Sequence, residues 1–220
     1  MNTTISLANI PGPHRGQPIL TAGESLAQAK AAMIMLHGRG ASAEDILSLT
    51  AEFEREGFAF LAPQAASHVW YPYSFLAPLT NNEPWLSSAL VAVETILAQV
   101  QAAGISAEKT ILLGFSQGAC LSVEFAARHA QRYGGVAVLS GALIGPAETP
   151  RDYADNLAGT PIFLGCSDVD FHIPKERVLY SAEILQRLGA TVTARLYPNM
   201  GHTVNEDELQ AVRHMMQMVL

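Results

Sequence analysis

The sequence predicts an α/β fold, in which helices cover both faces of a mostly parallel sheet, as one domain over residues 1–220. Short, almost continuously apolar runs recur along the chain, as in strands that are buried on both faces. Segments with helical periodicity lie between these runs, and such alternation is typical of parallel sheets. No linker or repeat divides the chain, and 220 residues suffice for one core without disulfides or metal ions.

The predicted elements follow one another along the chain in this alternating order. Six apolar runs are predicted to be strands: Met33–Leu36, Phe58–Leu61, Thr110–Leu113, Val136–Leu139, Ile162–Leu164 and Val192–Leu196. Apolar residues that share a face predict helices over 46–53, 86–100 and 209–219. Ser42 with Asp45, and Thr203 with Glu206, have the spacing of a capping box, which marks the start of a helix.

The stretch from Gln64 to Pro84 has no clear period and is predicted to be a long loop. It contains several aromatic residues, among them Trp70 and Tyr71, which are expected to line an apolar substrate pocket. The alternative is that these rings only pack the loop against the core.

Composition argues against several classes of partner. The formal net charge is −7, and no cluster of Lys and Arg is present, so neither nucleic-acid binding nor attraction to a membrane surface is expected. The chain contains no continuous apolar stretch of about 20 residues, so no integral membrane segment is expected. The first residues lack the basic and apolar regions of a signal peptide, which predicts a cytoplasmic protein.

Sulfur-containing residues give two further expectations. Cys120 and Cys166 lie in apolar segments and are expected to be buried thiols, although a bridge between them stays open. The C-terminus is rich in methionine, which predicts packing in the core or, alternatively, a homodimer contact.

A nucleophile motif follows the run Thr110–Leu113. Gly114-Phe-Ser-Gln-Gly118 has the Gly-x-Ser-x-Gly pattern between a strand and a helical segment, which is the context of a nucleophile elbow. The motif therefore predicts Ser116 as a nucleophile on a sharp turn at a helix N-terminus. The alternative is an ordinary turn between a strand and a helix.

A second glycine-rich loop, His37-Gly-Arg-Gly40, follows an earlier strand. A loop in this position predicts an oxyanion hole, with one backbone N–H from Arg39 and the other from Gln117, the residue after the nucleophile. His37 is then structural. The alternative is a turn without a chemical role.

An acid and a base are expected downstream, because the α/β-hydrolase order is Ser, Asp or Glu, then His. His202 follows the last predicted strand and is the best base, and His172, which lies close to the acids, is its one serious competitor. Asp168 and Asp170 both follow the strand before it and compete for the acid. Together with His172 they could also bind a metal ion, but such a loop more often caps a turn, so no metal site is expected.

Four motifs together resemble the phospholipase/carboxylesterase family, which includes acyl-protein thioesterases, lysophospholipases and carboxylesterases: His37-Gly-Arg-Gly40, Gly114-Phe-Ser-Gln-Gly118, Asp170-Phe-His-Ile-Pro174 and Gly201-His202. The resemblance implies an α/β-hydrolase fold without a separate lid domain. It also implies Ser116 as nucleophile, Asp170 as the orienting acid, His202 as base, and Arg39 and Gln117 as oxyanion-hole residues. Arg39 departs from the well-known thioesterases, which have an apolar residue there.

The expected reaction is hydrolysis of a small-molecule carboxylic ester or thioester by acyl transfer to Ser116, without a cofactor. Acyl-protein thioesterase activity is one alternative within this reading. A protein of another class, which binds a ligand in a hydrolase pocket without catalysis, is the second alternative.

Overall fold

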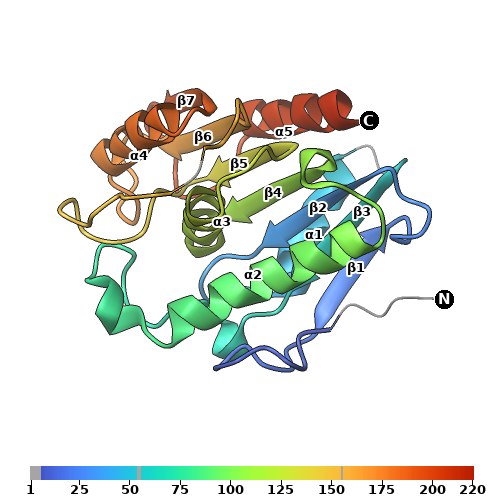
Figure 1. Cartoon of the computed structure of the whole chain (residues 1–220). Helices are drawn as coiled ribbons and strands as arrows, with labels where there is room; N and C mark the ends of the chain where they lie inside the picture. Colours follow the sequence, from blue (N-terminus) through green and yellow to red (C-terminus); the bar gives the residue numbers. More distant parts are fainter. Residues whose placement is uncertain (1–5, 54–55, 155) are drawn as a thin grey trace.

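A computed structural model describes residues 6–53, 56–154 and 156–220 (Figure 1). Seven strands form one sheet in the order β1-β3-β2-β4-β5-β6-β7, and only β1 runs antiparallel to its neighbour. The strands are β1 (Ile19–Gly23), β2 (Ala31–Leu36), β3 (Phe58–Pro63), β4 (Thr110–Phe115), β5 (Gly135–Leu139), β6 (Pro161–Ser167) and β7 (Thr191–Tyr197). The mostly parallel α/β fold is confirmed. β1 was not predicted, because this edge strand is only half-buried and has no continuous apolar run.

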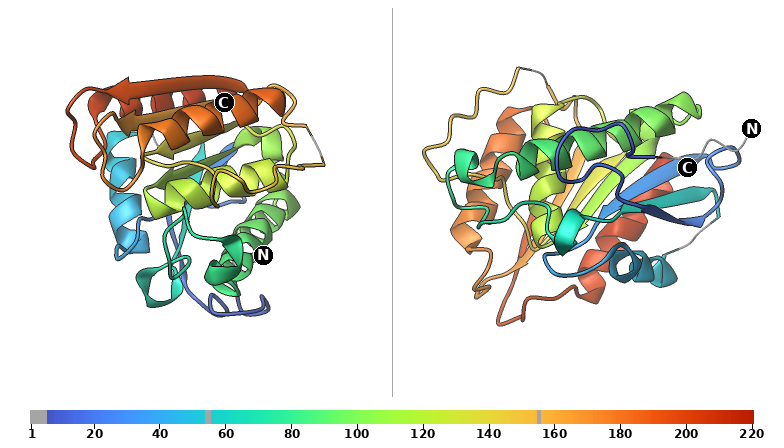
Figure 2. Two further views of the ribbon diagram at one scale, coloured as in Figure 1. Left: turned by 90° about the vertical axis from the view of Figure 1, so that its left-hand side faces the viewer. Right: turned by 90° about the horizontal axis from the view of Figure 1, so that it is seen from below.

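Helices cover both faces of this sheet, as expected (Figures 1 and 2). The α-helices are α1 (Ala43–Ser48), α2 (Trp85–Ala102), α3 (Gln117–Arg128), α4 (Lys175–Arg187) and α5 (Glu206–Val219). Short 3-10 helices are η1 (Leu49–Glu52), η2 (Ala66–His68), η3 (Leu79–Asn82) and η4 (Ala107–Lys109). The predicted 46–53 helix is therefore an α-helical turn continued by η1, and the long loop contains η2 and η3.

Alternate residues of the central strands face two separate halves of the core, as the period of two in a strand requires. Met33 and Met35 of β2 lie in the half that contains residues of α1 and α5, whereas Ile34 and Leu36 lie in the half that contains residues of α2, α3 and α4. The methionine-rich C-terminus contributes Met215 and Met216 to the first half, which confirms core packing for these two side chains. Met218 is 62% exposed.

One of the two predicted helix caps is confirmed and the other is wrong. The Ser42 side chain accepts from Asp45 N at the start of α1 and the reciprocal bond is present. At α5 the capping box is formed by Asn205 and Glu208, two residues beyond the predicted pair. Thr203 instead donates its backbone N–H to Gly201 O in the turn before the helix.

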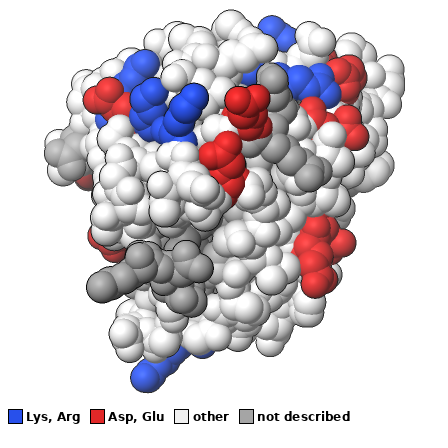
Figure 3. Space-filling view, turned by 90° about the vertical axis from the view of Figure 1, so that its right-hand side faces the viewer, with Lys and Arg blue, Asp and Glu red and all other residues white. Residues whose placement is uncertain are grey.

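Among the described residues, α2 is the one helix long and apolar enough to cross a membrane by length and composition. Half of that window is buried inside the protein, where Leu86, Val93 and Ile96 pack in the core. A buried core helix passes the same test, so α2 is explained by packing. Figure 3 shows a face on which Lys and Arg lie close to Asp and Glu and most of the visible surface is uncharged.

The carboxyl ends of the parallel strands bring four predicted motifs to one edge of the sheet. The loops that leave β2, β4, β6 and β7 carry Arg39, Ser116, Asp170 and His202, respectively. Ligands of open α/β sheets bind at this edge. Within residues 6–53, 56–154 and 156–220, no separate lid domain covers it.

Candidate active site

Ser116 sits on a strained turn between β4 and α3. Its backbone φ is 54° and ψ is −117°, a region that non-glycine residues rarely adopt, and its N–H donates to Leu139 O of the neighbouring strand. The turn needs both flanking glycines. A Cβ on Gly114 would lie 2.2 Å from Gly118 O, and one on Gly118 would lie 2.1 Å from Leu36 O. The local geometry is that of a nucleophile elbow.

A chain of two hydrogen bonds joins the predicted acid, base and nucleophile. The Ser116 hydroxyl lies 2.8 Å from His202 Nε2, and His202 Nδ1 lies 2.6 Å from Asp170 Oδ2. The ring then donates from Nδ1 to the carboxylate and accepts at Nε2 from the hydroxyl, the tautomer that this network requires. The structure thus brings together three residues that are far apart in the sequence.

Asp170 rather than Asp168 is the carboxylate that meets His202. The Asp170 side chain is fully buried, and its second oxygen accepts the backbone N–H groups of His172 and Ile173 at 2.8 and 3.1 Å. Asp168 accepts instead from Asn199 N at 2.8 Å and so fastens the turn that precedes His202. The residues alone left Asp168 and Asp170 open, and the geometry favours Asp170, the residue that the family resemblance implies.

The electrostatic environment keeps the Asp170 carboxylate charged. Burial acts to raise the pKa of Asp170, but the hydrogen bonds from His202 and from two backbone N–H groups outweigh it, so the pKa lies below its ordinary value. A charged, buried acceptor beside His202 Nδ1 favours the imidazolium that forms when Nε2 takes a proton.

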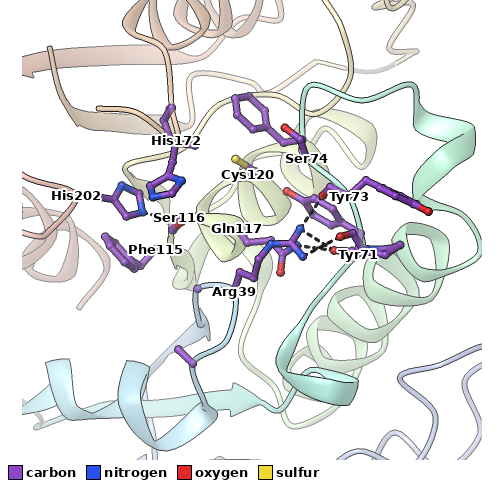
Figure 4. Close-up of a pocket in the computed structure, with 15 residues that line it drawn as sticks. Arg39, Tyr71, Tyr73, Ser74, Phe115, Ser116, Gln117, Cys120, His172 and His202 are labelled. Atoms are coloured by element: carbon purple, nitrogen blue, oxygen red, sulfur yellow. Dashed lines mark hydrogen bonds between the residues drawn. The ribbon is translucent and has the colours of Figure 1, made fainter. Parts of the chain in front are cut away.

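The two residues expected to form an oxyanion hole flank Ser116 in the same pocket (Figure 4). In the described part of the chain, neither Arg39 N nor Gln117 N donates a hydrogen bond to a protein acceptor. Gln117 is also the first residue of α3, where the helix dipole favours negative charge. Both N–H groups are therefore available to an oxygen of the substrate.

The pocket has a volume of about 500 Å³ and opens beside Ser116 and His202. Figure 4 shows His202, His172 and Phe115 on one side and Arg39 with Tyr71 and Tyr73 on the other. Tyr71 lines the cavity, as expected. The expectation for Trp70 was wrong, because its fully buried indole packs between His14 and His37 and donates to His37 O.

Cys120, His172, Phe115 and Ile173 line the pocket, although the sequence did not predict this position for them. Cys120 lies four residues after Ser116 on α3, so the i, i+4 spacing on one helix face could have placed it in the pocket. His172 and Phe115 contact the His202 ring, with ring centroids 4.8 and 5.0 Å from it. Phe75 also lines the pocket and belongs to the aromatic loop that was expected to do so, whereas no local pattern distinguishes Ile173 from an ordinary core residue.

The cysteines are buried and free, without a bridge between them. Burial raises the pKa of Cys120 and of Cys166 to about 12, so both stay protonated thiols at neutral pH. Neither is activated as a nucleophile. Within the described residues, no cluster of three His, Cys, Asp or Glu side chains has an arrangement that could hold a metal ion.

Known esterases and thioesterases are similar to this chain in sequence. A phospholipase/carboxylesterase family model matches residues 21–220. The SOBER1-like probable carboxylesterase of Arabidopsis thaliana is 28% identical over 200 residues, which span 83% of this chain and 76% of that protein. An acyl-protein thioesterase 1 of Aspergillus fumigatus is 26% identical over 222 residues, which span 89% of this chain and 90% of that protein.

A solved structure is similar over almost the whole chain. The phospholipase/carboxylesterase of Dyadobacter fermentans superposes with a TM-score of 0.89 at 41% identity, covering 95% of this chain and 100% of the other. The chain thus belongs to the phospholipase/carboxylesterase family of α/β-hydrolases, and it is a hydrolase of carboxylic ester or thioester bonds.

Proposed function

We propose that the chain hydrolyses esters or thioesters by two-step acyl transfer, with Ser116 as nucleophile, His202 as general base and acid, and Asp170 as the residue that orients His202. The observation that carries this proposal is the continuous hydrogen-bonded chain from the Ser116 hydroxyl through the imidazole to a fully buried carboxylate. Such a chain activates a hydroxyl that is otherwise a weak nucleophile.

In the first step, Ser116 Oγ attacks the carbonyl carbon while His202 Nε2 takes the hydroxyl proton. The carbonyl oxygen becomes an oxyanion, which accepts from the backbone N–H groups of Arg39 and Gln117. When the tetrahedral intermediate collapses, the bond to the alcohol or thiol breaks, and the imidazolium returns its proton to that leaving group. An acyl group remains on Ser116.

In the second step, a water molecule attacks the acyl carbon and His202 takes one of its protons. The second tetrahedral intermediate uses the same two N–H groups, and its collapse releases the carboxylic acid as the proton returns to Ser116 Oγ. Asp170 holds the imidazole in one tautomer throughout. This mechanism needs no cofactor.

The substrate class that fits the pocket is a small molecule with an apolar acyl or aromatic group. A cavity of about 500 Å³ lined by Tyr71, Phe75 and Phe115 offers mainly apolar surface beside the serine. Similar proteins are named carboxylesterases and acyl-protein thioesterases, so both ester and thioester substrates are proposed. A series of esters and thioesters of increasing acyl length, compared by kcat/KM, distinguishes the two and measures the acyl preference.

Substitution of the nucleophile tests the proposal directly. Ser116→Ala is expected to abolish hydrolysis of p-nitrophenyl butyrate while the circular dichroism spectrum stays unchanged. Ser122→Ala, a buried serine on the same helix whose hydroxyl donates to Ala119 O, is the matched control and should retain turnover. Turnover by the Ser116 variant at the wild-type rate would remove Ser116 from the mechanism.

A fluorophosphonate probe separates this enzyme from a binding protein with the same fold. The wild-type chain is expected to be labelled covalently on Ser116, because only an activated serine reacts at a useful rate. Binding of an ester analogue without labelling and without turnover would instead support the non-catalytic alternative.

The proposal also covers the setting of the enzyme. We propose a cytoplasmic protein in which residues 1–220 act as one catalytic domain, and a homodimer is kept as a hypothesis. Light scattering of the purified chain measures the oligomeric state, and fractionation of the producing cells measures the location.

A further inference from the structure

Arg39 is an exposed residue, but its side chain is bonded to the protein backbone. Its guanidinium donates to three consecutive carbonyl oxygens, those of Tyr71 at 3.0 Å, Pro72 at 2.9 Å and Tyr73 at 2.6 Å (Figure 4). The planar group also lies 6.0 Å from the centroid of the Tyr71 ring. One arginine therefore gathers three peptide groups of the pocket wall around itself.

The Gln117 side chain fastens the same segment from the other side. Its Oε1 accepts from Trp70 N at 2.9 Å, and its Nε2 donates to Tyr71 O at 2.7 Å. The Tyr71 carbonyl thus accepts from both Arg39 and Gln117. These are the two residues whose backbone N–H groups form the proposed oxyanion hole.

Segment 70–73 connects the loop that carries Arg39 with the turn that carries Gln117, beyond the last β2–β4 ladder pair. The parallel ladder between β2 and β4 ends at the pair Leu36 and Gly114, before either loop begins. Beyond that pair, the side chains of Arg39 and Gln117 meet on the segment, and the Trp70 indole adds a bond to His37 O at 2.8 Å. These side-chain bonds join the two loops in addition to the close packing of Gly118 against the backbone oxygens of Leu36 and His37.

We propose that Arg39 is a positioning residue of the oxyanion hole: its side chain, together with that of Gln117, holds segment 70–73 across the ends of β2 and β4 and so sets the separation of the two N–H groups. The inference rests on the proposed acyl-transfer function. Lysine cannot replace arginine here, because a single ammonium group does not present a planar fork of donors to three carbonyls.

The expected kinetic signature follows from when the oxyanion exists. The negative charge develops only in the transition state, so a displaced N–H lowers kcat and leaves KM nearly unchanged. Loss of a whole oxyanion-hole donor costs about 10²–10³-fold in kcat, and displacement of one is expected to cost roughly 10- to 100-fold.

The experiment compares Arg39→Met and Arg39→Lys with the wild-type enzyme on a neutral p-nitrophenyl ester. Both variants are expected to lose kcat by roughly 10- to 100-fold, with KM within about threefold of wild type and a similar loss of affinity for a trifluoromethyl ketone, which forms an oxyanion on the serine. Arg132→Met is the matched control, because Arg132 also donates to a loop carbonyl, Ala158 O, but lies away from the pocket. It should keep wild-type kinetics.

Chemical rescue adds a readout that general destabilisation does not give. Guanidinium ion at millimolar concentration should restore part of the kcat of Arg39→Ala, and sodium chloride at the same ionic strength should not. Unchanged kcat in both the Met and Lys variants would overturn the inference. So would a rise in KM confined to anionic esters, which would make Arg39 a substrate-binding residue.

Failure of this inference can be told from failure of the proposed function. If the wild-type enzyme and Arg132→Met turn over esters and the Arg39 variants do so equally well, only the positioning role is lost. If Arg39→Met does not fold, Arg39→Lys and the rescue of Arg39→Ala still decide the question. If the wild-type chain itself neither hydrolyses esters nor reacts with a fluorophosphonate, the proposed function fails.

Discussion

The two sides of the active-site pocket are held in different ways. The wall, residues 64–75, is fastened by side chains that reach its backbone from elsewhere in the chain, namely those of His14, His37, Arg39 and Gln117. The triad side, residues 168–174 and 198–205, is held mostly by bonds among its own residues, such as those that Asp170 and Asp168 accept. The wall therefore depends on distant residues and the triad side on local ones.

The buried ionisable groups under the two sides also differ. His14 and His37, under the wall, are fully buried and each accepts a backbone N–H at one ring nitrogen, and burial lowers the pKa of both. Glu208, beneath the triad side, is fully buried with one oxygen unpaired, and burial raises its pKa to about 7. Low pH is therefore expected to destabilise the wall, because it protonates the buried histidines. As the pH rises through about 7, ionisation of the buried Glu208 is expected to destabilise the triad side.

The largest expected effect concerns the local bonds of the triad side. Asp170→Asn should lower kcat by roughly 10⁴-fold, because the amide no longer selects the tautomer that accepts from Ser116. Asp168→Asn is the matched control. Its carboxylate contacts a backbone N–H of the base loop and not the His202 ring, so the expected loss is far smaller.

Steady-state kinetics on one p-nitrophenyl ester measures both variants. A larger loss in the Asp168 variant than in the Asp170 variant would transfer the orienting role to Asp168 and contradict the geometry described above.

The second prediction concerns the charge under the triad side. The folded-state pKa of Glu208 lies at about 7, above its ordinary value of 4.5, so the neutral form is favoured on folding. That favourable contribution is complete below pH 4.5 and is lost as the pH rises through 7. We therefore compare the unfolding free energy of Glu208→Gln with that of wild type at each pH. The variant-minus-wild-type difference should be about 3 kcal/mol larger at pH 8 than at pH 4.5.

Urea unfolding of the two proteins at both pH values measures this difference. Any effect of the buried amide on stability that does not depend on pH cancels when the differences at the two pH values are compared. Glu206→Gln, an exposed carboxylate in the first turn of the same helix, is the control and should show no gain of this size. If the stability difference between Glu208→Gln and wild type were the same at both pH values, ionisation of Glu208 would not destabilise the folded protein, which would contradict the prediction.

The contrast between the two sides also explains how much the sequence could predict. Ser116, Asp170 and His202 lie in short motifs that follow apolar strands, and the parallel topology brings the carboxyl ends of such strands to one edge. Local pattern and topology together therefore predicted the fold, Ser116 and His202, and they narrowed the acid to two residues. They could not separate Asp170 from Asp168, because that choice depends on the direction of two side chains two residues apart.

The wall was less predictable because its bonds join residues that are distant in the sequence. Nothing near Arg39 indicates that its guanidinium meets the carbonyls of Tyr71, Pro72 and Tyr73, and the aromatic character of Trp70 suited a pocket as well as a buried site. The antiparallel strand β1 was missed for a related reason, since its partner β3 provides the burial that its own sequence does not show.

The third prediction addresses the wall. The pKa values of His14 and His37 lie below their ordinary value of 6.5 in the folded protein, so both rings fold in the neutral form. Their contribution to stability is complete above pH 6.5 and is lost as the pH falls through the folded-state values. In the Glu208→Gln background, which removes the opposite response, the unfolding free energy should fall between pH 7 and pH 5.

Urea unfolding across this range measures the slope, and NMR titration of the imidazole C–H signals assigns it. His214→Gln, a change at an exposed histidine of α5, should leave the slope intact. A flat stability profile, or titration of both buried rings at pH 6.5 or above, would contradict the proposed neutral wall.

The smallest expected effect is that of truncating Phe171 on the triad side, and Phe75 of the wall serves as its buried counterpart. Phe171 follows Asp170 and is 96% exposed, whereas Phe75 of the wall is 6% exposed. Phe171→Ala should change the unfolding free energy by less than about 0.5 kcal/mol, because almost no surface is uncovered. Phe75→Ala should cost about 3–5 kcal/mol, as truncation of a buried phenylalanine does.

The Phe171 variant should also keep its kcat on a short ester, because the backbone N–H groups of His172 and Ile173, and not the Phe171 ring, hold the Asp170 carboxylate. Thermal or urea unfolding and steady-state kinetics on the same preparations measure both quantities. A stability loss above about 1 kcal/mol in Phe171→Ala, or a clear drop in its kcat, would show that the ring packs onto the protein in solution. The triad side would then depend on a side chain in the same way as the wall.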